Sequence, residues 1–198
     1  MDARTRSQRD AYNRIAKAYD RTEVLQRPFL GPTRAELLGR ARGRTLEVAF
    51  GSGHNLRHYP ADVDIVGLDL SSAMLALGRA RADAQGRTVR LLEGDAQHMD
   101  LPDQDFDTVS CVLALCTIPD QRAALAEMHR VLRPGGLLLL MDHIEYTRWP
   151  LRMTEARKAH PRRLPRSVAE QVGFVIDEHH RVGAGFVEAV VAYRRAPR

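Results

Sequence analysis

A doubly wound α/β fold, with a mostly parallel sheet and helices on both of its faces, is the fold class that this sequence predicts. Short apolar runs typical of buried strands alternate with longer amphipathic segments typical of helices. A second indication is that glycine or aspartate stands at the end of most of these runs. A chain of 198 residues without a repeat period corresponds most simply to one domain.

The segment 8–23 is expected to be a helix, since Tyr12, Ile15, Ala16 and Tyr19 fall on one face at helical spacing. That face either packs on the core or forms a lid that places Tyr12 or Tyr19 over a pocket. Both roles are open to a phenol, because it can pack and still donate a hydrogen bond.

Proline and glycine predict where further elements begin and end. Pro28, Gly31 and Pro32 are expected to break the chain before a second helix, which would end at Gly43. Ser71 is expected to cap a helix that runs toward Gly86. The other expected helices lie at 33–41, 120–132 and 167–172, with one or two helical turns at 55–59. The expected strands lie at 45–50, 65–70, 89–92, 106–115, 137–141, 174–177 and 186–193.

Charge is unevenly distributed along the chain, whose net charge is +5. Residues 1–44 carry 11 basic and 5 acidic groups and residues 144–166 carry 7 and 2, whereas residues 45–143 carry 8 and 14. The basic flanks either follow genome composition, or cover one site and favour an anionic substrate or a lipid headgroup surface. Nucleic acid is not an expected partner, because aromatic residues are not interleaved with the basic ones.

The two cysteines do not indicate a metal site. Cys111 and Cys116 lie in one apolar segment without histidine or carboxylate neighbours at metal-ligand spacing, so buried thiols and no bound metal are expected. No run approaches the ~20 apolar residues of a membrane span, and the polar N-terminus lacks the apolar block of a secretory signal. We therefore expect a cytoplasmic protein.

In a sheet of this class, ligands bind beyond the carboxyl ends of the strands, where the strand order reverses. Gly51 and Gly53 follow the first strand and allow a tight turn close to a ligand. Asp69 lies 18 residues beyond Gly51, near the ~20-residue spacing at which a carboxylate meets a ribose diol. Leu56 stands where dinucleotide-binding loops have a third glycine, which disfavours NAD or FAD. S-adenosylmethionine, which has no phosphate, fits these features better.

With these motifs the chain resembles the class I S-adenosylmethionine-dependent methyltransferases of the ubiquinone and menaquinone biosynthesis type. The resemblance spans about residues 12–143 and implies a Rossmann-like sheet of seven strands, the last of them antiparallel. It rests on 46–53 (LEVAFGSG), 67–71 (GLDLS) with 74–75 (ML), 93–96 (EGDA), 106–109 (FDTV) and 127–136 (EMHRVLRPGG). Residues 116–120 (CTIPD) and the pair Asp142-His143 are most similar to bacterial phospholipid N-methyltransferases and small thiol methyltransferase-like proteins.

The resemblance implies positions for the cofactor. Glu47, Gly51 and Gly53 would surround its methionine portion, Asp69 would hold the ribose, and backbone near Leu113 would approach the sulfonium. Adenine would be recognised by Asp95 with Ala96. The remaining expected cofactor-binding residues are Ser52, Asn55, Leu70 and Met74.

One departure from the family lies in the glycine loop, where Ala49 replaces the first glycine. We expect cofactor binding to survive with a negative φ at this position. His143, at the end of the fifth strand, is the expected general base for a phenol or alcohol acceptor, with Tyr12 and Tyr19 as positioning groups. The alternative for His143 is a structural histidine bonded to a loop carbonyl.

The expected organisation is an N-terminal helical lid (1–44), a cofactor-binding core (45–143), a short substrate cap (144–166) and a C-terminal helix with a strand pair (167–198). The expected function is methyl transfer to a small-molecule or lipid-like acceptor. One alternative is phosphatidylethanolamine-type phospholipid N-methylation, with peripheral contact to an anionic membrane. Another is a regulator that binds S-adenosylmethionine without turnover.

Overall fold

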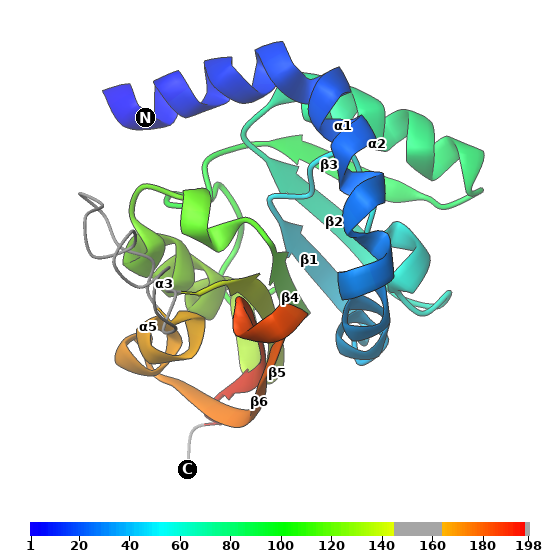
Figure 1. Ribbon diagram of the computed structural model, residues 1–198. Helices are drawn as coiled ribbons and strands as arrows, with labels where there is room; N and C mark the ends of the chain where they lie inside the picture. Colours follow the sequence, from blue (N-terminus) through cyan, green and yellow to red (C-terminus); the bar gives the residue numbers. More distant parts are fainter. Residues whose placement is uncertain (145–163, 197–198) are drawn as a thin grey trace, which may run out of the picture.

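This computed structural model describes residues 1–144 and 164–196, apart from the side chains of 22–28. The strands in this part of the chain form one seven-stranded sheet (Figure 1). The strand order is β3-β2-β1-β4-β5-β7-β6, so the order reverses between β1 and β4. β1 to β5 are parallel, and β7 is antiparallel to both β5 and β6. The strands are β1 (Arg44–Val48), β2 (Asp64–Asp69), β3 (Val89–Glu93), β4 (Phe106–Val112), β5 (Leu132–His143), β6 (Phe174–Val182) and β7 (Val187–Arg194). The predicted fold class is confirmed.

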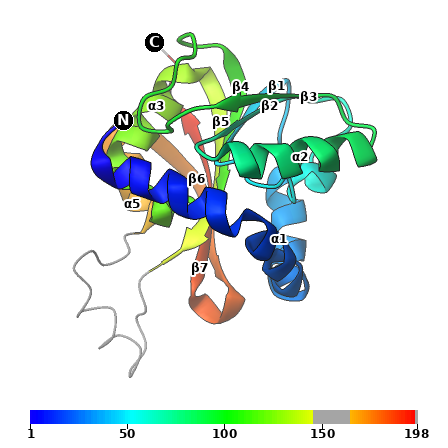
Figure 2. The same ribbon diagram turned by 90° about the horizontal axis from the view of Figure 1, so that it is seen from above.

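Helices cover both faces of this sheet, as Figures 1 and 2 show. Alternate residues of a strand point to opposite faces, and β5 illustrates the two layers. Met141 belongs to a buried cluster with Leu37 of α1 (Ala3–Leu38) and Leu75 of α2 (Ser72–Ala84). Leu140 belongs to a second cluster with side chains of α3 (Gln121–Val131) and α5 (Pro165–Val172).

The N-terminal helix differs from the prediction. A single helix, α1, spans 3–38, whereas we expected one helix over 8–23, a break at Pro28, Gly31 and Pro32, and a second helix ending at Gly43. The chain bends within α1 instead of leaving the helix (Figure 1). A proline within a helix bends it by removing one N–H from the hydrogen-bond ladder. Burial of Leu30, Leu37 and Leu38 against the sheet stabilises the C-terminal part of this helix.

Short turns replace regular structure where the chain leaves β1 and β4. One 3₁₀ turn (Leu56–His58) follows the glycine loop, and a second (Leu115–Thr117) follows β4. β4 ends at Val112, three residues before its expected end, because Leu113 has a positive φ of 55° and leaves the strand. A third turn (Gly183–Gly185) joins β6 to β7. The expected substrate cap at 144–166 falls almost entirely outside the described residues.

No helix within the described part of the chain is long and apolar enough to cross a lipid bilayer.

Candidate active site

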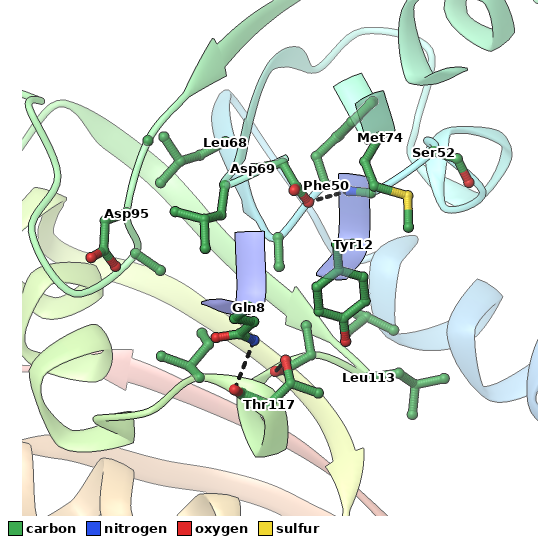
Figure 3. A pocket seen from close by; sticks show the side chains of 18 of the residues that line it. Gln8, Tyr12, Phe50, Ser52, Leu68, Asp69, Met74, Asp95, Leu113 and Thr117 are labelled. Carbon is green, nitrogen blue, oxygen red and sulfur yellow. Dashed lines mark hydrogen bonds between the residues drawn. The ribbon is translucent and has the colours of Figure 1, made fainter. Parts of the chain in front are cut away.

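A cavity lies at the carboxyl ends of the central strands, beneath the N-terminal half of α1 (Figure 3). It encloses about 950 Å³ of space, its open mouth included. Most of the predicted site residues line it: Tyr12, Tyr19, Gly51, Ser52, Asn55, Asp69, Leu70, Met74, Asp95, Ala96 and Leu113. Three predicted residues are not among the lining residues: Glu47, Gly53 and His143.

The glycine loop is held by β2. Phe50 N–H donates to the carbonyl of Leu68 (2.9 Å), and Gly51 N–H donates to the Asp69 carboxylate (2.7 Å). These bonds fix the path of the chain, so Ala49 adopts a φ of +57° and our expectation of a negative φ there is wrong. A left-handed conformation costs a non-glycine residue about 1–2 kcal/mol. The loop therefore carries backbone strain where it borders the cavity.

Asp69 anchors this corner of the cavity. One carboxylate oxygen accepts from Gly51 N–H, and the other accepts from Ser71 N–H at 2.8 Å. Burial raises the pKa of Asp69, while these backbone hydrogen bonds act in the opposite direction. Each carboxylate oxygen has a second acceptor position, so a ligand hydroxyl can bond to it as well.

Glu47 lies behind the loop instead of facing the cavity. Its side chain is buried, and Oε1 accepts from Asn55 Nδ2 at 2.6 Å. Burial raises the pKa of Glu47 to about 7, although the bond from Asn55 and the positive charge of Arg34 act in the opposite direction. Glu47 therefore orients Asn55, which does line the cavity. Gly53 also lies outside the cavity lining. A Cβ at this position would lie 3.2 Å from the Phe50 ring.

The N-terminal half of α1, which we call the lid, carries Tyr12 and Tyr19 and borders the cavity. Asn13 Oδ1 accepts from Ser71 Oγ (2.6 Å) and from Ala73 N–H (3.2 Å), which ties α1 to the start of α2. Gln8 donates to the carbonyl of Thr117 at 2.8 Å (Figure 3). The lid thus bonds to the chain on both sides of the cavity.

A charged group makes a further connection between the lid and the glycine loop. Asp20 of α1 accepts from His54 Nε2 and from Arg81 Nη2, each at 2.8 Å. Arg81 also donates to the carbonyl of Ser52. Burial alone would raise the pKa of Asp20, but its bonds to Ser52 and Arg81 outweigh that effect and lower it. His54 lies in the cavity wall, shortly before the 3₁₀ turn at Leu56–His58.

The end of β3 supplies the part of the cavity expected to hold adenine. Asp95 accepts from both the backbone N–H and the side-chain amide of Gln97, each at 2.9 Å. Gln97 also donates to Thr5 of the lid (3.1 Å) and accepts from Asp120 N–H (2.9 Å). Gln97 therefore holds the loops after β3 and β4 and the lid together beside Ala96.

Aromatic and apolar groups line the cavity on the side of β4. The rings of Tyr12 and Tyr19 make an edge-to-face contact with 6.0 Å between their centroids. Burial raises the pKa of Tyr12, so its phenol stays protonated near neutral pH and can donate a hydrogen bond. Leu113, with its positive φ, brings backbone into the cavity at the end of β4.

His143 lies outside the cavity lining, in a cluster with Cys116 and Asp142. Asp142 is buried, and its two carboxylate oxygens accept from Cys116 N–H (2.7 Å) and from His143 N–H (2.6 Å). Neither cysteine forms a disulfide. Cys111 is buried as expected, whereas Cys116 is partly exposed and close to an imidazole and a carboxylate.

The sequence analysis missed several lining residues, of which α1 contributes three: Thr5, Gln8 and Arg34. Thr5 and Gln8 fall seven and four residues before Tyr12, so extending the predicted helix toward the N-terminus would have placed them on its face. Arg34 could not be found in this way, because we expected a break at Pro28, Gly31 and Pro32. Its buried guanidinium lies close enough to Glu47 to lower the pKa of that carboxyl.

The chain is similar to known proteins both in sequence and in fold. Residues 46–140 match a family model described as a methyltransferase domain. A solved structure of a SAM-dependent methyltransferase from Thermotoga maritima, described as a possible histamine N-methyltransferase, superposes with a TM-score of 0.71. The superposition covers 94% of this chain and 99% of the Thermotoga maritima chain, at 20% sequence identity. It therefore supports the Rossmann-like fold of this chain. Residues 46–140 are thus similar to a methyltransferase domain, and the described chain shares the fold of S-adenosylmethionine-dependent methyltransferases.

Two curated relatives narrow the comparison. A demethylmenaquinone methyltransferase from Deinococcus radiodurans is 40% identical over 54% of this chain and 46% of its own. A phosphatidylethanolamine N-methyltransferase from Cereibacter sphaeroides is 35% identical over 57% of each chain. The matched region thus spans about half the length of these relatives. Both belong to the types of methyltransferase that the sequence motifs resemble.

Proposed function

We propose that this protein transfers a methyl group from S-adenosylmethionine to a small-molecule or lipid-like acceptor. The observation that carries the proposal is the single cavity wall formed by Asp69 at the end of β2, Asp95 at the end of β3 and the glycine loop after β1. The glycine loop of this wall borders the gap between β1 and β4, where the strand order reverses and ligands usually bind in such sheets.

The chemistry of the wall fits the parts of the cofactor. Asp69, fixed by two backbone N–H groups, would accept both ribose hydroxyls. Asp95, fixed by Gln97, would accept from the adenine amino group, with Ala96 against the ring. At the other end, Ser52, Asn55 and the positive Arg34 offer polar partners for an amino acid tail. We propose Arg34 as the partner of its carboxylate, a role that the sequence analysis did not anticipate.

Bound S-adenosylmethionine would supply an electrophilic methyl group on a sulfonium. The contribution of the chain would be alignment of the acceptor and exclusion of water by the lid. In favourable systems, such alignment contributes about 7–11 kcal/mol. Tyr12 and the carbonyl of Thr117, which accepts from Gln8, would orient the acceptor beside Leu113. Tyr19 would support Tyr12 through their ring contact.

The general base remains a prediction. His143 does not line the cavity, so a direct contact with an acceptor requires a path past Cys116 or Thr117. An amine or thiol acceptor needs only to be deprotonated before transfer. Cytoplasmic location likewise remains a prediction.

A second candidate is N-methylation of a phospholipid headgroup in peripheral contact with an anionic membrane. The phosphatidylethanolamine N-methyltransferase named above and the basic flanks of the sequence favour it. Co-sedimentation with anionic and neutral vesicles at low and high salt is the test. Salt-sensitive binding to anionic vesicles supports this candidate, and indifference to both vesicle types removes it.

Radiolabelled methyl transfer tests the proposal as a whole. The acceptor panel consists of demethylated quinones, phosphatidylethanolamine vesicles, small thiols and phenols. We expect label in one class, with Asp69→Ala as the inactive control. Binding of the cofactor without transfer to any class would favour the third candidate, a regulator without turnover.

A further inference from the structure

The geometry points to a zinc-type metal site formed by Cys116, Asp142 and His143. Spacing along the sequence does not indicate it, because these residues come from two separate segments. Parallel pairing of β4 with β5 brings their carboxyl ends together, and Cys116 follows β4 while Asp142 and His143 end β5. The thiol, one carboxylate oxygen and one imidazole nitrogen all lie within 4.8 Å of one another.

These distances are close to those around a bound ion. Bonds of about 2.0–2.3 Å to a tetrahedral zinc put its ligand atoms about 3.3–3.7 Å apart. Side-chain rotations that move each atom by about 1 Å would therefore complete the site. The backbone around it is already fixed, since Asp142 bonds to the N–H groups of both Cys116 and His143. Each of its oxygens retains an acceptor position for a metal.

A second buried carboxylate lies beside Asp142. Asp142 lies directly opposite Glu188 in the β5–β7 register, and both carboxylates are buried. Like charges in this arrangement repel each other. Arg166 forms an ion pair with Glu188 at 3.1 Å. Among the described residues, no arginine or lysine forms an ion pair with Asp142. A bound divalent ion would neutralise this corner.

The chemical types of the three side chains indicate which metal ions the site would bind. Thiolate and imidazole suit Zn²⁺ and its neighbours in the first transition row, whereas Mg²⁺ and Ca²⁺ prefer sets made of oxygen alone. Three protein ligands also leave one coordination position open, as in catalytic rather than structural zinc sites. Cys116 stands between Ala114 and Thr117, which line the cavity, so the cluster adjoins the proposed acceptor subsite. An ion there would lower the pKa of a bound thiol or hydroxyl. His143 would then serve as a ligand and not as the general base.

Cobalt provides a direct test, because it reports its ligands through absorption and requires neither cofactor nor acceptor. The untagged full chain, treated with chelator and kept reduced with a phosphine, is titrated with Co²⁺. We expect one equivalent to bind, with a near-ultraviolet thiolate-to-cobalt band and visible bands of four-coordinate intensity, all displaced by Zn²⁺. Asp69→Ala, which removes the proposed cofactor contact, is expected to leave this spectrum unchanged, so the two proposals can fail separately.

Variants assign the ligands. Cys116→Ser should abolish the charge-transfer band, while Cys111→Ala, at the only other cysteine, should retain it. Asp142→Asn and His143→Gln should weaken Co²⁺ binding at least about 10- to 100-fold, the range reported for loss of even an outer partner. Circular dichroism establishes that each variant is folded. A folded wild-type protein that binds no stoichiometric Co²⁺, a band that survives Cys116→Ser, or full affinity in His143→Gln would each overturn the proposal.

Discussion

Replacement of Asp69 by asparagine tests the cofactor site with little change in shape. The amide has one acceptor oxygen, so it can satisfy only one of the two N–H groups, of Gly51 or of Ser71, that the carboxylate accepts at 2.7 and 2.8 Å. Its NH₂ group then faces the other N–H. The ribose diol likewise loses a charged acceptor that could receive both hydroxyls.

The expected magnitude follows from these bonds. A hydrogen bond to a charged group contributes about 1.5–3 kcal/mol and a neutral one about 1 kcal/mol. Exchange of two charged bonds to the ribose for one neutral bond costs about 2–5 kcal/mol, or roughly 30- to 5,000-fold in Kd. Titration calorimetry with S-adenosylhomocysteine measures it directly.

A matched control lies on the same strand. Asp64 is exposed at the opposite end of β2, so Asp64→Asn makes the same chemical change away from the cavity. We expect its Kd to equal that of the wild type, and urea unfolding verifies that both variants are folded. An Asp69→Asn protein that is folded and binds within about threefold of the wild type would refute our assignment of Asp69.

Three further variants probe the lid and the loop. Since burial raises the pKa of Glu47 from 4.5 to about 7, the free energy of unfolding of the wild type should fall by about 3 kcal/mol as the pH rises from below 4.5 to 8. Glu47→Gln should remove that fall. A wild-type urea midpoint that does not change from pH 5 to 8 contradicts this prediction. Asn13→Ala deletes the hydrogen bonds to Ser71 and Ala73, so amide hydrogen exchange should accelerate in the N-terminal half of α1 but not in β4 or β5. Unchanged exchange would mean that other contacts hold the lid in place. Ala49→Gly should stabilise the protein by up to about 1 kcal/mol and leave the affinity for the cofactor within a few fold of that of the wild type. A large change in affinity would mean that the methyl group of Ala49 shapes the loop.

The sheet and the acidic wall of the cavity could be predicted from the sequence, because both depend on local patterns. Apolar runs mark strands wherever they lie, and parallel strands carry Asp69 and Asp95 to the same edge. The continuous α1 could not be predicted, since local signals at Gly31 and Pro32 favour a break. Burial of the leucines that follow them outweighs those signals.

Two features could not be predicted for the same physical reason, namely that they depend on contacts between residues distant in sequence. Ala49 has a positive φ because bonds from its neighbours to β2 fix the loop, and nothing in the local sequence encodes those bonds. Cys116 meets Asp142, 26 residues later, only through the pairing of β4 with β5. A search for metal ligands by spacing along the chain cannot find such a group.

The most direct test of the central claim is titration calorimetry of the wild-type protein with S-adenosylmethionine. Our account predicts one binding site per chain, competed by S-adenosylhomocysteine and weakened in Asp69→Asn but not in Asp64→Asn. A folded wild-type protein that binds neither compound would contradict the assignment of the cavity and, with it, the proposed function.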